Sequence, residues 1–114
     1  MEHILFKQKV KEEAKAEYIN EHKNASYEFL RSFEESGIKR AIVWIDKKNN
    51  DLFIYMLTED FRKSMSKLIS KEIHKKWVLK MKPLLADIQD YSSENNINQL
   101  EKIFDVEEQS LKFK

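Results

Sequence analysis

The stretch AEYINEH, residues 16–22, sets a tyrosine and a histidine four residues apart, at Tyr18 and His22. On an α-helix this spacing places both side chains on nearly the same side. That side is apolar, and the residues that continue it at helical spacing are Ala14, Ala25, Phe29 and Phe33. Because an unperturbed pKa of ~6.5 keeps both protonation states of histidine accessible near neutrality, His22 is a candidate acid–base group. From the residues alone, a core histidine hydrogen-bonded to a backbone carbonyl or to Tyr18 is the competing interpretation.

Two tryptophans, Trp44 and Trp77, are further candidates for a binding site. Their rings can lie against an apolar ligand face, but large aromatic side chains also pack cores and interfaces, and both interpretations stay open. His3 and His74 have no partner at metal-ligand spacing, so no metal site is predicted. The single glycine leaves no phosphate-binding loop, and the lack of cysteine excludes disulfides and thiolate chemistry. Ser26 has no nucleophile elbow around it, which argues against a hydrolase.

Composition and charge limit the remaining classes of function. The 114 residues, 41% of them hydrophobic, indicate one domain. The lack of cysteine and an N-terminus, MEHILFKQKV, without signal peptide or membrane span predict a cytoplasmic protein with no membrane contact. A formal net charge of +1 gives no global field for nucleic acid. The lysine ladder Lys63, Lys67, Lys71 and Lys75 is interpreted as a solvated helix face.

The elements that must position these residues follow one order along the chain. Hydrophobic periodicity predicts a strand over residues 3–10 and a helix over 11–36, ended by Gly37. The runs AIVWID and DLFIYML, joined by KKNN, predict a β-hairpin. A second helix runs from Phe61 until Pro83 forbids its continuation. After the polar loop YSSENNINQ, the run LEKIFDV predicts a last strand and residues 107–114 form a tail.

The order β-α-β-β-α-β is that of a ferredoxin-like sheet with both helices on one face, so the predicted fold class is α+β. Such a sheet leaves its other face uncovered. Alternating residues such as Trp44, Phe53 and Tyr55 would lie on that face. Since an exposed apolar sheet face usually marks an interface or a binding cleft, we expect a homodimer.

Several short motifs follow one another along the chain. They are Tyr18 with His22, Gly37 before a strand, the segment IDKKNNDLF, Trp77 running into MKP, and the closing LEKIF. In this order and spacing the chain resembles the L-rhamnose mutarotase family from about Phe6 to Val106, within a domain core of residues 3–106. The resemblance implies a ferredoxin-like fold that assembles as a dimeric α+β barrel and needs neither a metal nor an organic cofactor. It also implies a cofactor-independent isomerase that interconverts the α and β anomers of L-rhamnose.

Carried over position by position, the resemblance makes His22 the proton donor and Tyr18 a sugar-contacting residue. Trp77 keeps half of the family's tryptophan pair, with Lys76 at the other position, and Ala41 stands where the family has a substrate-binding tyrosine. The predicted site therefore has His22 as its catalytic residue. Its candidate substrate-binding residues are Tyr18, Trp77, Lys76 and Trp44.

Anomer exchange opens the pyranose ring. A base takes the proton of the anomeric hydroxyl, an acid protonates the ring oxygen, and the open aldehyde closes again on either face. We expect His22 to donate the proton to a monosaccharide, L-rhamnose or a related deoxy sugar, with Asp46 or a bound water as the complementary base. The alternative is a non-catalytic sugar-binding or sensor module on the same dimeric fold, in which His22 is structural. A third interpretation, a small oxygenase that binds haem or a quinol, rests on fold analogy alone.

Overall fold

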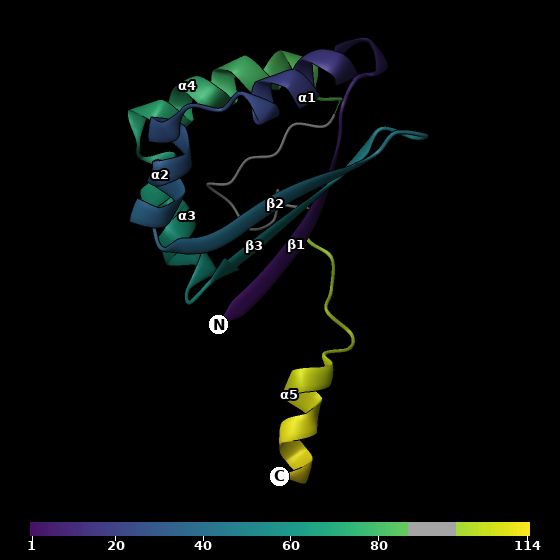
Figure 1. Cartoon of the computed structure of the whole chain (residues 1–114), viewed down its shortest axis with the longest axis vertical. Coiled ribbons are helices and arrows are strands. Elements are labelled where there is room, and N and C mark those ends of the chain that lie inside the picture. Colours follow the sequence, from purple (N-terminus) through teal and green to yellow (C-terminus); the bar gives the residue numbers. More distant parts are fainter. Residues whose placement is uncertain (87–97) are drawn as a thin grey trace.

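The computed structural model of the chain describes residues 1–86 and 98–114 (Figure 1). Within these residues the strands β1 (Glu2–Lys9), β2 (Ile38–Asp46) and β3 (Asp51–Thr58) form an antiparallel sheet in the order β1-β3-β2. The helices α1 (Lys15–Lys23), α2 (Tyr27–Glu35), α3 (Phe61–Ile69) and α4 (Glu72–Met81) curve around one side of the sheet. The predicted α+β fold with its helices on one face is confirmed.

Alternating burial along β1 and β3 separates a covered face of the sheet from an open one. On β1, Ile4, Phe6 and Gln8 are buried while the residues between them are half-buried. On β3 the alternation places Leu52, Ile54, Met56 and Thr58 on the covered face. Side chains opposite each other in an antiparallel pair share a face, so the β2 residues Ala41, Val43 and Ile45, paired with Met56, Ile54 and Leu52, complete the covered face. Trp44, opposite Phe53, belongs to the open face.

The predicted hairpin is confirmed, with β2 and β3 paired and a turn at residues 47–50. Two side chains close the turn by accepting from the backbone: the Asp46 carboxylate from the Lys48 N–H at 2.9 Å, and Asn49 Oδ1 from the Asp51 N–H at 3.0 Å. Asn50 takes a positive φ of 67°, a conformation that asparagine tolerates better than most residues. The asparagines of KKNN therefore serve the turn as expected.

The single helix predicted over residues 11–36 is wrong in one respect, because the chain leaves the helix between α1 and α2. Asn24 ends α1 with its side-chain amide on the Asn20 carbonyl at 2.8 Å. Ser26 then caps α2, its Oγ accepting from the Phe29 N–H at 3.1 Å. Capping side chains compete with continued helix, and here they redirect the chain so that α2 turns away from α1 and runs down to the start of β2 (Figure 1).

The second predicted helix is also divided. α3 ends at Ile69, where the Ser70 hydroxyl donates to the Lys67 carbonyl at 2.7 Å, and Lys71 is extended before α4 begins at Glu72. Asp60 caps α3 by accepting from the Lys63 N–H at 3.1 Å. Beyond α4 the chain tightens into a 3₁₀ turn, Lys82–Leu84, that contains Pro83. The proline thus stops the helix as predicted.

The last predicted strand is reduced to an isolated bridge between Phe6 and Gln99, with a hydrogen bond from the Leu100 N–H to the Leu5 carbonyl at 2.7 Å. Residues 101–105 take no regular structure, so a strand over LEKIFDV is wrong for most of its length. The predicted tail instead forms α5 (Val106–Ser110), which extends away from the rest of the chain (Figure 1). Of the polar loop over residues 91–99, residues 91–97 lie outside the described residues.

The core fills the space between the covered sheet face and the helices. Its fully buried members, with no more than 2% of their surface exposed, include Phe6, Val10, Leu52, Met65 and Leu68. Within residues 1–86 and 98–114, no helix is long and apolar enough to cross a membrane.

Gly37 stands at the junction of α2 and β2 with a φ of +92°, which an L side chain rarely adopts. A Cβ at this position would lie 3.1 Å from Ser64 Oγ. We therefore expect Gly37→Ala to lower the free energy of unfolding by about 1–2 kcal/mol, measured by urea denaturation. Ser66→Ala, at an exposed position of α3, is the control and should leave it nearly unchanged. Equal stabilities for both variants would contradict the strain assigned to position 37.

Candidate active site

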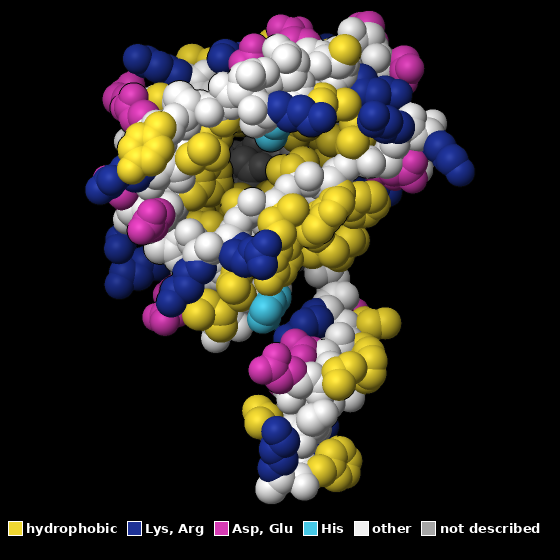
Figure 2. Space-filling model, in the orientation of Figure 1, with side chains coloured by type: hydrophobic (Ala, Val, Ile, Leu, Met, Phe, Trp, Pro, Cys, Tyr) yellow, Lys and Arg dark blue, Asp and Glu magenta, His cyan; other side chains and the backbone are white. Residues whose placement is uncertain are grey.

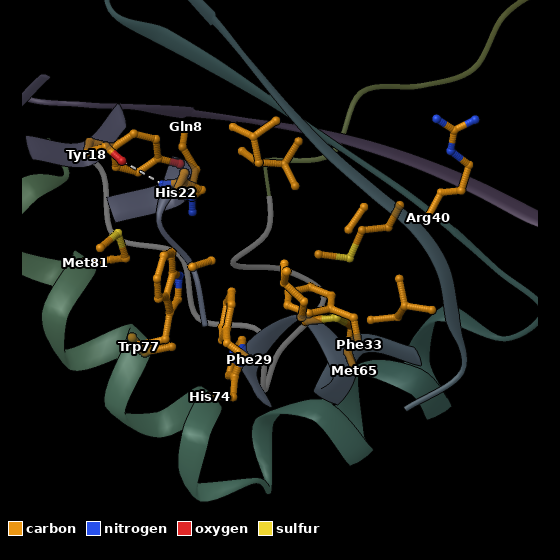
Figure 3. Close-up of a pocket in the computed structure, with 18 of the residues that line it drawn as sticks. Gln8, Tyr18, His22, Phe29, Phe33, Arg40, Met65, His74, Trp77 and Met81 are labelled. Atoms are coloured by element: carbon orange, nitrogen blue, oxygen red, sulfur yellow. Dashed lines mark hydrogen bonds between the residues drawn. The ribbon is translucent and has the colours of Figure 1, made fainter. Parts of the chain in front are cut away.

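A cavity of about 530 Å³ lies between the covered face of the sheet and helices α1, α2 and α4 (Figures 2 and 3). In Figure 2 its mouth is bordered largely by hydrophobic side chains. The sheet supplies Gln8, Ala41, Val43, Ile54 and Met56. The helices supply Tyr18 and His22 from α1, Phe29 and Phe33 from α2, and Trp77 and Met81 from α4.

The imidazole of His22 is half-buried and is oriented by its own helix and by α4 (Figure 3). Its Nδ1 lies 2.8 Å from the carbonyl oxygen of Tyr18. Since a carbonyl can only accept, Nδ1 carries a proton and donates it to this bond. The Tyr18 ring lies 4.1 Å from the imidazole centre, and Trp77 meets the imidazole edge-on at 5.0 Å. Nε2 is consequently the atom whose proton can change.

Burial lowers the pKa of His22 below its ordinary value, while the hydrogen bond to Tyr18 and the charge of Glu21 act in the opposite direction. The imidazole is therefore neutral near pH 7. With Nδ1 protonated, the neutral ring presents Nε2 as a base. A proton bound there in one step can be returned in the next.

Trp77 forms the wall beside His22. The Phe29 ring stacks on it at 4.2 Å with an interplanar angle of 23°, and Lys80 Nζ lies 5.9 Å from its ring centre. Lys80 also reaches Glu21 on α1 at 2.8 Å, an exposed ion pair that joins α4 to α1 beside the site. Surface ion pairs of this kind contribute little stability.

Two polar residues of the cavity were not predicted as site residues. Gln8 is 5% exposed and projects from β1 beside Tyr18 and His22 (Figure 3), and His74 on α4 is also 5% exposed. Burial lowers the pKa of His74 as well, so it too is neutral near pH 7. A glutamine in the apolar register Ile4, Phe6, Gln8, Val10 was the available sequence signal, because a polar group among buried positions needs a reason to be there.

The structure brings together three of the predicted site residues, Tyr18, His22 and Trp77. Trp44 lies on the open face of the sheet and is 53% exposed, and Lys76 is exposed on α4; neither lines the cavity. Asp46, considered as the complementary base, closes the hairpin turn and does not line the cavity either. The charged side chains at the cavity are Lys23, Glu34, Lys39, Arg40 and Lys82.

Among the described residues, no group of three or more histidine, aspartate or glutamate side chains could hold a metal ion. The chemistry visible in the cavity is that of a neutral imidazole beside a phenol, an indole and a carboxamide. These groups can exchange a proton with a neutral ligand and hydrogen-bond its hydroxyls.

Comparison with protein families matches residues 3–106 to the model for L-rhamnose mutarotase. Among solved structures, an L-rhamnose mutarotase from Formosa agariphila is similar over 92% of this chain and 98% of its own, with 24% identity and a TM-score of 0.71. The protein Rv0793 from Mycobacterium tuberculosis matches over 90% of this chain and 95% of its own, with 6% identity and a TM-score of 0.58. A dimeric ferredoxin-like protein from an uncultured marine organism matches over 86% and 83%, with 11% identity and a TM-score of 0.50. No curated protein matches the chain.

The electrostatics of His22 give a prediction for its titration. Because burial lowers its pKa, the native state binds this proton more weakly than the unfolded chain does. The contribution of His22 to stability should be fully present above the unfolded-state pKa of ~6.5 and be lost as the pH falls from there to the native pKa. We expect the His22 imidazole resonances in ¹H–¹⁵N NMR to titrate below pH 6.5 and the 15N shifts to identify Nδ1 as protonated. A His74→Asn variant makes the assignment, and a His22 midpoint above the ordinary value would contradict the prediction.

Proposed function

Since the chain belongs to the L-rhamnose mutarotase family, we propose that it is an aldose mutarotase in which His22 transfers the proton during ring opening of L-rhamnose or a related deoxy sugar. The observation that carries the proposal is the position of His22. His22 lines a cavity shared with Tyr18, Gln8 and Trp77, and because its Nδ1 is held by the Tyr18 carbonyl at 2.8 Å, Nε2 is the ring nitrogen left for a ligand.

The reaction needs one proton to leave the anomeric hydroxyl and one to reach the ring oxygen. A neutral His22 starts as the base: Nε2 takes the hydroxyl proton as the C1–O5 bond breaks and C1 becomes an aldehyde carbon. The imidazolium so formed is the proton donor, and it protonates O5. Rotation about C1–C2 and the reverse steps close the ring in the other anomer. One residue thus acts as base and then as acid, so no second titratable partner is required.

Tyr18 and Trp77 supply binding in this scheme. The phenol can hydrogen-bond a sugar hydroxyl, and the indole offers a flat apolar surface to the C–H-rich side of a deoxy sugar. Gln8, with both a donor and an acceptor on its carboxamide, suits a second hydroxyl. These residues carry no charge, as expected for a neutral substrate.

We expect His22→Ala to lower the rate of α-to-β exchange of L-rhamnose by about 100- to 10,000-fold, the usual contribution of a positioned acid–base group. Exchange NMR on the anomeric protons measures this rate directly. Lys75→Ala, at an exposed position of α4, is the matched control and should exchange the sugar at the wild-type rate. Binding of the sugar without acceleration by the wild-type protein would instead identify a sugar-binding or sensor module.

Tyr18→Phe separates binding from catalysis. The substitution removes the phenol hydroxyl but keeps the backbone carbonyl that orients His22. We therefore expect KM to rise by about 10-fold, the value of one lost hydrogen bond, while kcat stays within a factor of a few. A fall in kcat at unchanged KM would assign the phenol a role in proton transfer.

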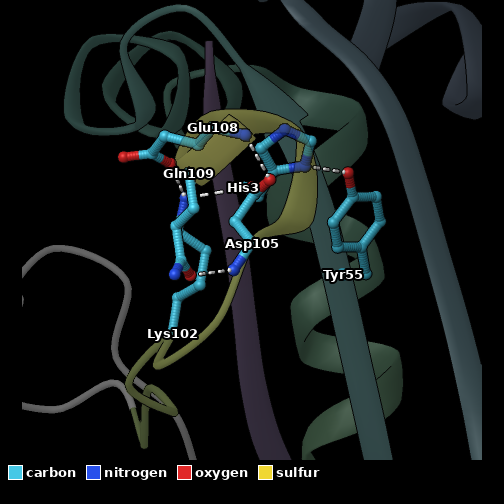
Figure 4. A network of polar contacts seen from close by, with 6 residues as sticks. All are labelled: His3, Tyr55, Lys102, Asp105, Glu108 and Gln109. Carbon is cyan, nitrogen blue, oxygen red and sulfur yellow. Dashed lines mark hydrogen bonds and ion pairs between the residues drawn. The ribbon is translucent and has the colours of Figure 1, made fainter. Parts of the chain in front are cut away.

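We further propose that the protein is a homodimer formed through the open face of the sheet. The residues of this face at the centre of the sheet are Leu5, Ile42, Trp44, Phe53 and Tyr55. The terminal segment adds exposed apolar side chains, with Ile103 86% and Phe104 67% exposed. It lies near the start of β1, with Lys102 bonded to Glu108 at 2.6 Å beside the His3–Tyr55 hydrogen bond (Figure 4). Apolar surface of this extent is best accounted for by burial against a second copy.

Trp44→Glu tests the dimer by placing a charge at the centre of the open face. We expect it to convert a dimer into a monomer in analytical ultracentrifugation, because an unpaired carboxylate is costly to bury. Leu79→Glu introduces the same charge at a residue of α4 that is 71% exposed, and it should leave the dimer intact. A wild-type protein that sediments as a monomer would contradict the proposal.

A further inference from the structure

The cavity changes from polar to apolar along the strands that form its floor. Gln8 lies in register with Leu52, next to the Phe6–Ile54–Val43 row, which is followed by the Ile4–Met56–Ala41 row. Because strands rise ~3.3 Å per residue, the Met56 and Ala41 end lies about 13 Å from Gln8 along the sheet. The floor beyond Gln8 consists of Ile54, Val43, Met56, Ala41 and Ile38.

The wall changes in the same direction. Ring contacts run from His22 to Trp77 at 5.0 Å, from Trp77 to Phe29 at 4.2 Å and from Phe29 to Phe33 at 5.2 Å. Figure 3 shows Gln8, Tyr18 and His22 together at one end, and Phe33 with Met65 at the other. Arg40, near this second end, directs its guanidinium away from the cavity (Figure 3). Among the described residues, the lining at this end is mainly aromatic, aliphatic and thioether, and the charged residues Glu34 and Lys39 that also line the cavity are exposed.

Such a surface does not suit a ligand with hydroxyls on every side. The polar end can satisfy the anomeric hydroxyl and its neighbours, whereas a hydroxyl pressed against the side chains of Phe33 or Met65 would lose its water and gain no hydrogen bond from them. The cavity volume of about 530 Å³ is also in the range of ~300–1,000 Å³ that holds drug-sized ligands, more than one pyranose ring requires. Both observations indicate that the ligand continues past the sugar ring with an apolar group.

We propose that the substrate is a deoxy aldose that carries an apolar O-alkyl or O-acyl group on the ring carbons opposite the anomeric carbon, C3 or C4. The anomeric hydroxyl and ring oxygen meet His22, the ring lies against Trp77, and the substituent extends between Met56, Met65 and Phe33. The inference rests on the proposed mutarotase function. In it, the apolar end of the cavity selects which sugar is the substrate.

The test compares L-rhamnose with its 3-O-methyl and 4-O-methyl ethers. Exchange NMR on the anomeric protons gives kcat/KM for each sugar, and saturation-difference titration gives each Kd. Because one methyl or methylene group in a hydrophobic pocket changes kcat/KM by ~10–200-fold, at least one ether should exceed L-rhamnose about 10-fold or more. The same ether should bind more tightly than L-rhamnose.

Ala41→Phe fills the apolar end from an exposed strand position, where an aromatic side chain is well tolerated. It should abolish the preference for the ether over L-rhamnose. Ala16→Phe makes the same change at an exposed position of α1 outside the cavity and should keep the preference. Circular dichroism and urea denaturation establish that both variants are folded.

The outcomes separate this inference from the proposed function. Acceleration of L-rhamnose exchange equal to or greater than that of both ethers overturns the inference and leaves the mutarotase intact. Tighter binding of an ether without acceleration of any sugar overturns the mutarotase and supports the assigned ligand. Equal or weaker binding of the ethers, without acceleration of any sugar, overturns both.

Discussion

Side-chain alternation in a sheet covered on one face only is the constraint on which the remaining structure depends. Each strand must send every second side chain toward the helices, and the residues between them away from the helices. On β3 the first set, Leu52, Ile54 and Met56, makes the core and the cavity floor. The second set, Phe53 and Tyr55, makes the open face. A single strand thus serves the cavity and the open face at once, and a shift of one residue would exchange them.

The sequence was sufficient for the features that depend on local periodicity. The alternation of β1, the asparagine turn between β2 and β3, the stop at Gly37 and the end before Pro83 each depend on residues close together in the chain. The breaks at Ser26 and Ser70 were missed because the hydrophobic stripe continues across them. Only the competition between side-chain and backbone hydrogen bonds, at 3.1 Å for Ser26 and 2.7 Å for Ser70, decides against one long helix.

Some contacts of the candidate site could likewise be predicted from local sequence and others could not. Tyr18 and His22 share one helix, so their spacing alone predicts that they meet, and their ring centres are 4.1 Å apart. The contact of His22 with Trp77 joins α1 to α4, and nothing local to either helix determines it. Trp44 was considered beside Trp77 because both are large aromatic residues, yet the strand alternation turns it to the open face. Residue type identifies a candidate, and only the tertiary arrangement decides which candidates share a cavity.

Burial decides how His22 can act. A half-buried imidazole is poorer at holding a charge than one in water, so its resting state is neutral, and the Tyr18 carbonyl leaves Nε2 as the basic atom. A reaction in which His22 first donates a proton would need the charged imidazolium at the start. A reaction in which His22 first takes a proton starts from the neutral imidazole. The proposed anomer exchange moves a proton from one oxygen of the sugar to another, so in that scheme the imidazole is charged only between the two transfers. The proposed reaction therefore suits a largely apolar cavity whose charged lining side chains, among the described residues, are exposed.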